Sequence, residues 1–270
     1  MRGVSSESLA AGQERLETLL TSAGSDPATL GDDLFAVTDV LAASPALRRA
    51  LTDPARDGEA KAALVQRIFS GRVSGVAVDV LGGLARSRWS EAGDLTDAVE
   101  SYATSAVLAA AERAGRLDNV EDELFRFART VEGNQGLRDA FSQRVAGTER
   151  KADLVRTLLQ GRAAPETVRL AVQAAAHPRG LRTAHVLEQY VQAAAERRRQ
   201  VVVHVVAATP LTTEQRSRLE AALQRRYGRV RLNVDVDPEV LGGLRVQVGS
   251  ELVDGTLSAR LDEARRRLAG

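Results

Sequence analysis

Residues Leu34–Arg72, LFAVTDVLAASPALRRALTDPARDGEAKAALVQRIFSGR, return 90 positions later as Leu124–Arg162, LFRFARTVEGNQGLRDAFSQRVAGTERKADLVRTLLQGR. Without a gap, 12 of the 39 aligned positions are identical, among them the opening Leu-Phe, the central Lys-Ala and the closing Gly-Arg. Self-similarity at a fixed spacing is the sequence signature of a repeated supersecondary unit. The chain is therefore predicted to contain an internal duplication of a helical unit.

Both copies carry the apolar spacing of an amphipathic helix. Large apolar residues recur at i, i+3 and i+7, which places them on one face of a helix. This stripe is formed by Leu34, Val37 and Leu41 in the first copy and by Leu124, Phe127 and Val131 in the second.

Capping residues set the helix boundaries in both copies. Ser44-Pro45 is a helix N-cap followed by a first-turn proline, and Asn134 is the equivalent cap in the second copy. Further helices are predicted over 59–69 and 149–159, ending near glycines, and others begin near Val76 and at Pro165. Long helices are predicted over 95–114 and 183–200. The first of these joins the copies, so they are expected to share one continuous helix.

The pattern changes after residue 200 from the helical period to the alternation of strands. Residues 201–208 are predicted to form a buried strand, and Thr212 with Gln215 forms a capping box that opens a helix ending at Tyr227-Gly228. Strands over 230–236, 244–248 and 251–253 follow, and then a last helix over 256–268. The fold class is predicted to be mainly α, with two tandem six-helix-type bundles followed by a β-α-β-β-β-α module.

Composition excludes several classes of protein. The formal charge is +1, from 37 basic and 36 acidic residues, which gives no global field to attract nucleic acid or an anionic membrane. The chain has no cysteine, so disulfides and thiolate sites are excluded. It has no apolar run near the ~20 residues that span a bilayer, and residues 1–20 do not form a signal peptide. A soluble protein is expected, without direct membrane insertion.

Residues with catalytic or ligand-binding chemistry are sparse. The three histidines, the glycine pairs, two strand-end aspartates and the single tryptophan are each better explained as structural, and no glycine-rich loop ends in the Gly-Lys-Ser/Thr of a phosphate cradle. These residues are His177, His185, His204, Gly82-Gly83, Gly242-Gly243, Asp235, Asp237 and Trp89. No catalytic, cofactor-binding or metal-binding residue is predicted, and the chain is not expected to be an enzyme.

Two arginine runs suggest a rival hypothesis, binding to nucleic acid. Arg197-Arg198-Arg199 and Arg265-Arg266-Arg267 could contact nucleic acid, but cations near the C-terminus of a helix also complement its dipole. The structural explanation is favoured. The alternative is a helical adaptor or nucleic-acid-associated regulator, which a steep salt dependence of binding would reveal.

The segment from Asp237 to Gly249, DPEVLGGLRVQVG, followed by LVDGT at 252–256, resembles the signature of ATP synthase delta subunits, which are similar to the mitochondrial oligomycin-sensitivity-conferring protein. The family pattern has a Gly-Gly before an alternating strand, a one-turn reversal, an acidic residue with glycine, and a basic helix. The signature residues are Gly242, Gly243, Gly249, Asp254 and Gly255. Residues 104–200 resemble the family's six-helix bundle. The copy ahead of it departs from the common pattern and resembles enlarged actinobacterial forms.

The resemblance implies a non-catalytic connector of the proton-translocating ATP synthase that resists rotor torque. The bundle would bind N-terminal helices of the alpha subunits of the catalytic head, and the C-terminal module would bind the C-terminal end of the stalk-forming b subunit. No cofactor and no nucleic acid are implied, and the location would be peripheral, at the cytoplasmic face of the bacterial cell membrane. The implied domains are 1–103, the extra bundle; 104–200, the family-like bundle; and 201–270, the stalk-binding module. Which bundle contacts alpha is left open.

Overall fold

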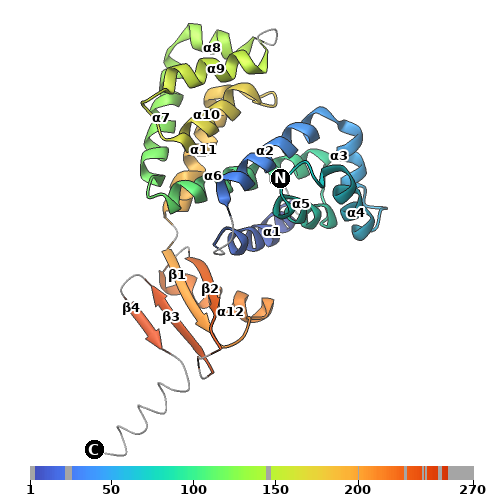
Figure 1. Ribbon diagram of the computed structural model, residues 1–270, viewed down its shortest axis with the longest axis vertical. Coiled ribbons are helices and arrows are strands. Elements are labelled where there is room, and N and C mark those ends of the chain that lie inside the picture. Colours follow the sequence, from blue (N-terminus) through green and yellow to red (C-terminus); the bar gives the residue numbers. More distant parts are fainter. Residues whose placement is uncertain are drawn as a thin grey trace, which may run out of the picture. The chain divides into compact units, whose positions relative to one another are not determined.

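In the computed structural model the described residues are 4–21, 26–143, 147–199, 201–227, 230–238, 240, 242–248 and 251–254. The chain divides into two compact units, with the boundary between Arg198 and Arg199 (Figure 1). The first unit is helical, and the second contains the sheet.

The described helices of the first unit follow the predicted repeat. They are α1 (Val4–Thr21), α2 (Pro27–Ala43), α3 (Pro45–Thr52), α4 (Gly58–Phe69), α5 (Gly75–Arg86), α6 (Ala92–Arg113), α7 (Leu117–Gly133), α8 (Gln135–Ser142), α9 (Thr148–Leu159), α10 (Pro165–Ala176) and α11 (Thr183–Arg198). Helices α3, α4 and α5 have the same lengths as α8, α9 and α10, namely 8, 12 and 12 residues. The predicted apolar stripes of α2 and α7 are buried, with exposed fractions of 5% or less.

Equivalent caps begin equivalent helices. Ser44 Oγ accepts a hydrogen bond from the Leu47 N–H at 3.2 Å, and Asn134 Oδ1 accepts one from the Leu137 N–H at 3.1 Å. Each bond satisfies a first-turn donor that has no partner within its helix. The predicted caps are therefore confirmed.

A long-range contact is also repeated. The Ser74 N–H, at the start of α5, donates to Asp33 Oδ2 at 2.8 Å, and the Ala164 N–H, at the start of α10, donates to Glu123 Oε2 at 2.8 Å. Both pairs of residues are 41 positions apart. The duplication therefore repeats the packing of α5 on α2 in the packing of α10 on α7.

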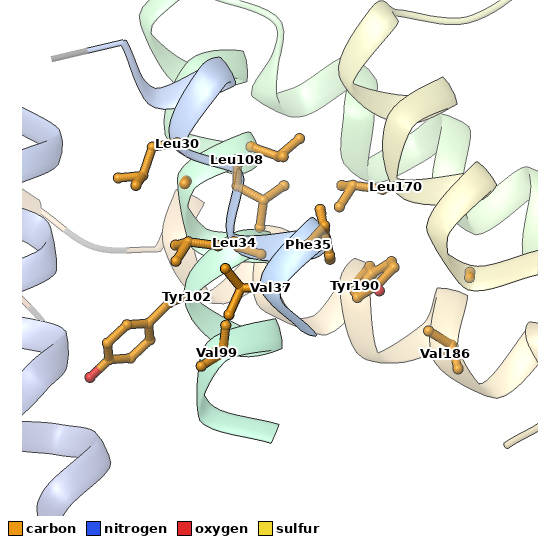
Figure 2. Close-up of a cluster of buried hydrophobic side chains, with 14 of the residues drawn as sticks. Leu30, Leu34, Phe35, Val37, Val99, Tyr102, Leu108, Leu170, Val186 and Tyr190 are labelled. Carbon is orange, nitrogen blue, oxygen red and sulfur yellow. The ribbon is translucent and has the colours of Figure 1, made fainter. Parts of the chain in front are cut away.

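Helix α6 is one continuous helix at the junction of the copies, as expected. It packs against α1, α2, α3 and α5 from the first copy and against α7, α10 and α11 from the second. Its apolar residues are buried around most of its circumference, which is typical of a helix inside a protein. Figure 2 shows its Val99, Tyr102 and Leu108 among side chains of α2, α10 and α11.

The second unit contains a four-stranded sheet of order β2-β1-β3-β4. Its strands are β1 (Val201–Ala207), β2 (Val230–Val236), β3 (Leu244–Val248) and β4 (Glu251–Asp254). Strand β1 is parallel to β2 and antiparallel to β3, and β3 is antiparallel to β4. The parallel pair requires a crossover connection, which α12 (Thr213–Tyr227) supplies.

A capping box and one apolar face define this small unit. The Thr212 N–H donates to Gln215 Oε1 at 2.9 Å, and the Gln215 N–H donates to Thr212 Oγ1 at 3.2 Å, as predicted. Leu219 and Leu223 of α12 pack against the buried valines and leucine of the sheet, among them Val203. The order β-α-β-β-β agrees with the prediction, and the predicted last helix, 256–268, lies outside the described residues. The predicted class, mainly α with a small α+β module, is confirmed.

Candidate functional site

Two glycines of the predicted signature, Gly242 and Gly243, lie in the connection between β2 and β3. Val236 ends β2 and Leu244 begins β3, and both pair with Ala207 at the end of β1, from opposite sides. The chain therefore passes the end of β1 between these two strands. The sequence pattern gave the strands but not their order, because strand order depends on long-range pairing.

Positive φ angles explain why glycines occupy this connection. Gly242 and Gly243 have φ of 64° and 82°, a region that side chains with a Cβ rarely adopt. The Asp237 N–H donates to the Ala207 carbonyl at 2.9 Å, and the Gly242 N–H donates to the Val240 carbonyl at 2.8 Å. Val240 is buried. The connection is thus a folded segment with its own backbone bonds.

Of the other three signature residues, the structure describes Asp254. Asp254 is the last residue of β4 and is paired with Arg245 of β3. Gly249 and Gly255 lie outside the described residues. A functional role for any of the five signature residues remains a prediction.

The histidines lie on different elements of the chain. His177 follows α10 and its Nδ1 lies 2.9 Å from Asp39 Oδ1, His185 is on α11, and His204 is in β1 of the other unit. Within the described ranges, no group of three or more His, Cys, Asp or Glu side chains could hold a metal ion. Trp89 is in the core and its indole N–H donates to the Leu84 carbonyl at 2.8 Å.

The first arginine run connects helices inside the protein. The Arg197 guanidinium has an exposed side-chain fraction of 7% and contacts Glu17 of α1 at 3.0 and 3.2 Å and Glu112 of α6 at 2.8 Å. Arg198 pairs with Glu121 of α7 at 2.9 Å. A guanidinium that is 7% exposed and already paired with two carboxylates is not accessible to a phosphate, so Arg197 does not support the nucleic-acid hypothesis. The second run, 265–267, lies outside the described residues.

Helix α10 of the second copy packs on α2 of the first. Arg169 pairs with Asp32, and its guanidinium carbon lies 5.3 Å from the centroid of the Phe35 ring, in cation–π geometry. Gln173 and His177 both reach the Asp39 carboxylate, at 3.3 and 2.9 Å. On α2 the contacting residues are Asp32, Phe35 and Asp39, which lie at i, i+3 and i+7 and so share one face of the helix.

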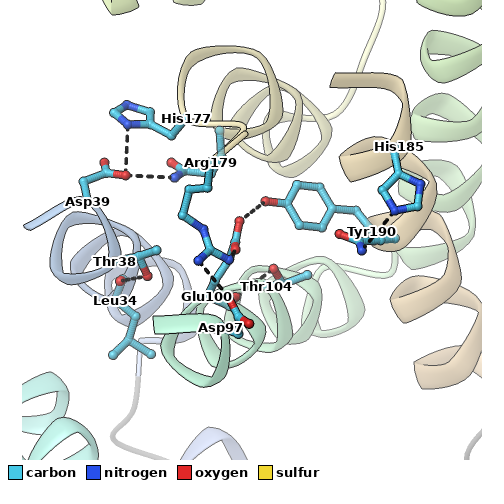
Figure 3. Close-up of polar contacts among 12 residues, drawn as sticks. Leu34, Thr38, Asp39, Asp97, Glu100, Thr104, His177, Arg179, His185 and Tyr190 are labelled. Atoms are coloured by element: carbon cyan, nitrogen blue, oxygen red, sulfur yellow. Dashed lines mark hydrogen bonds and ion pairs between the residues drawn. The ribbon is translucent and has the colours of Figure 1, made fainter. Parts of the chain in front are cut away.

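Arg179 makes a second polar contact between the copies, shown in Figure 3. It pairs with Asp97 at 2.8 Å and with Glu100, and the Tyr190 hydroxyl donates to Glu100 at 3.2 Å. Its φ of 47° is the one positive value at a non-glycine position in the described part of the chain, a conformation that costs about 1–2 kcal/mol. The ion pairs to α6 offset this cost.

The face of α5 that corresponds to the α2-binding face of α10 is open. Val76 is 38% exposed, Asp79 is exposed, and Val80 and Gly83 are half-buried. Their counterparts in α10 have partners: Arg169 and Gln173 contact α2, Leu170 is in the core, and Glu166 pairs with Arg116. A Cβ added to Gly83 would meet nothing within 4 Å. Val76, Val80 and Gly83 follow one another at helical spacing, as the apolar anchors of helix-on-helix docking do.

No sequence pattern distinguishes these packing residues. Asp32, Phe35, Arg169 and Arg179 were missed, because each resembles an ordinary surface or core residue when it is considered alone. One signal was present: Arg169 stands where the first copy has Asp79, a reversal of charge between equivalent positions. Such a reversal indicates that the two faces have different neighbours.

Within the described residues, no helix is long and apolar enough to cross a membrane. Comparison with known proteins gives a consistent result over the whole chain. A family model described as "ATP synthase delta (OSCP) subunit" matches residues 98–268.

Curated relatives match both copies and the sheet unit. The chain is 54% identical to "ATP synthase subunit delta" of Kineococcus radiotolerans over 99% of this chain and 98% of the relative. It is 50% identical to the protein of the same name from Streptomyces coelicolor, over 100% of this chain and 98% of the relative. A chain of the Toxoplasma gondii mitochondrial ATP synthase hexamer aligns over 62% of this chain and 95% of that chain, with 22% identity and a TM-score of 0.28, too low to support an argument about the fold.

Proposed function

Because this chain belongs to the ATP synthase delta (OSCP) family, we propose that it is the connector that ties the catalytic head of the enzyme to its b stalk and resists rotor torque. Members of this family are structural subunits of the peripheral stalk and not catalytic ones. The protein is accordingly a peripheral part of a membrane-associated complex, in contact with other subunits of it. The proposed location is the cytoplasmic face of the bacterial cell membrane.

The proposed partner of the helical unit is an amphipathic N-terminal helix of an alpha subunit. The observation that carries this proposal is the open stripe on α5, formed by Val76, Val80 and Gly83. On α10 the equivalents of Asp79 and Gly83, Arg169 and Gln173, contact α2, which supports helix-on-helix docking on this side of α5 as well. Apolar anchors at helical spacing supply affinity in this mode of recognition.

The helical unit is proposed to be two six-helix bundles, α1–α6 and α6–α11, that share α6. Repeated contacts to the shared helix support this arrangement. The Tyr102 hydroxyl of α6 donates to the Leu9 carbonyl of α1 at 2.8 Å, and the Tyr190 hydroxyl of α11 donates to Glu100 of α6 at 3.2 Å. Helix α6 is thus the last helix of the first copy, as α11 is the last helix of the second. The proposed domain scheme of 1–103, 104–200 and 201–270 has its first boundary inside α6.

A shared helix suits a subunit under load. A sideways force on one bundle would reach the other through the continuous backbone of α6 and through the ion pairs at Arg197 and Arg179, rather than through a flexible linker. The sheet unit, 201–270, is the proposed site for the C-terminal end of b.

Calorimetric titration with a synthetic alpha N-terminal helix tests the proposal. Val76→Asp places a charge on the α5 stripe and should weaken binding by about tenfold or more, since a buried unpaired charge is costly. Val40→Asp, on α2, is the matched control, because Val40 is also an exposed helical valine, at 44% against 38%. Equal affinities of the two variants would exclude α5 as the docking face.

Affinity purification tests the wider assignment. In mild detergent the full chain should retain the alpha, beta and b subunits. Their absence would overturn the proposed connector function. A fragment over 92–270, which keeps α6 whole, should unfold cooperatively if the second bundle is a unit of its own.

A further inference from the structure

A cavity of about 650 Å³ opens at one end of the second copy, between the last turn of α7, α8, the start of α9 and the α10–α11 loop. Its volume lies within the range of small-molecule sites, which is about 300–1,000 Å³. Its apolar wall is formed by Val131, Phe141, Ala176, Pro178, Leu181 and Ala184.

Lys151 brings a buried ammonium to this cavity. The residue is 9% exposed, lines the cavity, and donates from Nζ to the Phe141 carbonyl at 2.7 Å. An ammonium carries three donors, so this bond leaves two for a ligand. Buried cations favour an anionic partner, because the alternative is an uncompensated charge.

The first turn of α11 faces the same cavity. Thr183, Ala184 and His185 line it, and the helix begins at Thr183. First-turn N–H groups have no intrahelical partner, and the N-terminus of a helix carries partial positive charge. Lys151 and the α11 N-terminus together form a carboxylate-binding corner beside an apolar wall.

The other charged groups of the lining nearly balance. The cations are Arg138, Lys151 and Arg182, together with Arg179, which is already paired with Asp97 and Glu100, and the carboxylates are Glu132, Asp139 and Glu188. Glu132 accepts from Arg129 at 3.0 Å, and Glu188 lies 3.8 Å from His185. Two of the three carboxylates thus have a basic neighbour, which reduces their repulsion of a bound anion.

The first copy has a smaller cavity at the equivalent place. It measures about 570 Å³ and is lined by Lys61, which donates to the Ser87 carbonyl at 3.2 Å, and by the buried Trp89 of the α5–α6 loop. In the α10–α11 loop Arg179 occupies the position of Trp89 and turns toward α6, and Leu181 is 45% exposed. The wall of the second cavity is therefore formed without an indole.

We propose that this cavity binds an apolar monocarboxylate. The carboxylate lies against the Lys151 ammonium and the first turn of α11, and the hydrocarbon chain lies along the wall at Phe141 and Leu181. Nothing in the connector function requires this site, so the proposal stands independently of it.

Calorimetric titration of octanoate into the full chain tests the proposal. One saturable site is expected, and Lys151→Met should weaken binding by about tenfold or more, the usual effect of losing a charge-assisted bond. Lys61→Met is the matched control, since it removes the equivalent buried lysine of the first copy, and should leave binding unchanged. Octanamide, which has the same chain without the charge, should bind about tenfold more weakly or worse.

A second variant keeps the test decisive if Lys151→Met folds poorly. Ala184→Trp keeps the lysine and fills the cavity from the half-buried first turn of α11, so it should abolish octanoate binding. The proposal is overturned if octanoate shows no saturable binding to the wild-type chain, if octanamide binds equally well, or if Ala184→Trp binds octanoate as the wild type does.

Discussion

Arg197 connects α11 to α1 and α6 through two ion pairs, and replacing it should loosen the helical unit. In Arg197→Met the apolar stem is kept, but the carboxylates of Glu17 and Glu112 lose their cation while remaining 14% and 29% exposed. Breaking a buried ion pair from one side costs about 3–5 kcal/mol. Because Glu112 is partly open to water, we expect the lower end, about 3 kcal/mol.

The single tryptophan makes the measurement specific to this unit. Trp89 is buried in the helical core, so its fluorescence reports unfolding of the helical unit and not of the sheet unit. For a unit of this size, about 2–4 °C of melting temperature is lost per kcal/mol, which predicts a decrease of about 6–12 °C. Urea denaturation followed by the same fluorescence gives the free energy of unfolding directly.

Two comparisons decide whether the reasoning holds. Arg198→Met removes the neighbouring arginine, which is 50% exposed, and should cost less than about 1 kcal/mol. The triple variant Arg197→Met, Glu17→Gln, Glu112→Leu removes the two carboxylates together with their cation and should recover most of the stability. Equal losses for Arg197→Met and Arg198→Met, or no recovery in the triple variant, would refute the account of a buried clamp.

Other predictions concern both units. Gly243→Val should cost the sheet unit about 1–3 kcal/mol, because valine does not tolerate the positive φ, and hydrogen exchange in β1 and β3 should increase while binding to b weakens; unchanged exchange would contradict this. Burial raises the pKa of the Tyr102 and Tyr190 hydroxyls above the ordinary value of 10.0, so stability is retained below about pH 10 and lost above it. Absorbance of their tyrosinates should therefore appear only with loss of tryptophan fluorescence. Ionisation of these hydroxyls without that loss would contradict the assignment of the raised pKa to burial. Ser44→Ala and Asn134→Ala should each cost about 1 kcal/mol in urea denaturation, and a loss confined to one of them would contradict the equivalence of the two caps.

Much of the fold was predictable because the deciding residues act locally. The Ser44 cap, the Thr212–Gln215 capping box and the alternation of β3 each act within a few residues of the backbone that they order. The duplication then allowed one copy to be checked against the other. Helix ends such as Gly71 and Gly161, with φ of 74° and 68°, agree in the two copies for the same reason.

Long-range packing was not predictable in the same way. The order β2-β1-β3-β4 depends on which strand pairs with β1, and alternating apolar residues do not encode a choice of neighbour. The site on α5 was missed for a related reason. Among the described residues, no helix covers this face of α5, whereas α2 contacts the corresponding face of α10. A stretch of sequence taken by itself does not show which helix packs on it.

The two copies diverge at the faces where they meet, and these differences can be interpreted as a map of the interface. Phe35 is fully buried under Arg169, whereas its counterpart Phe125 is 53% exposed on α7. Asp39, which accepts from Gln173 and His177, corresponds to an arginine at position 129. If both copies offered the same pair of faces, each copy could bind the next one through the contact that α10 makes with α2. An open-ended chain of bundles would follow. Charge differences between equivalent positions prevent this, because α10 carries the cation that suits α2 whereas α5 carries an aspartate in its place. The duplication therefore yields one closed contact between the copies and leaves the face of α5 available to a different partner.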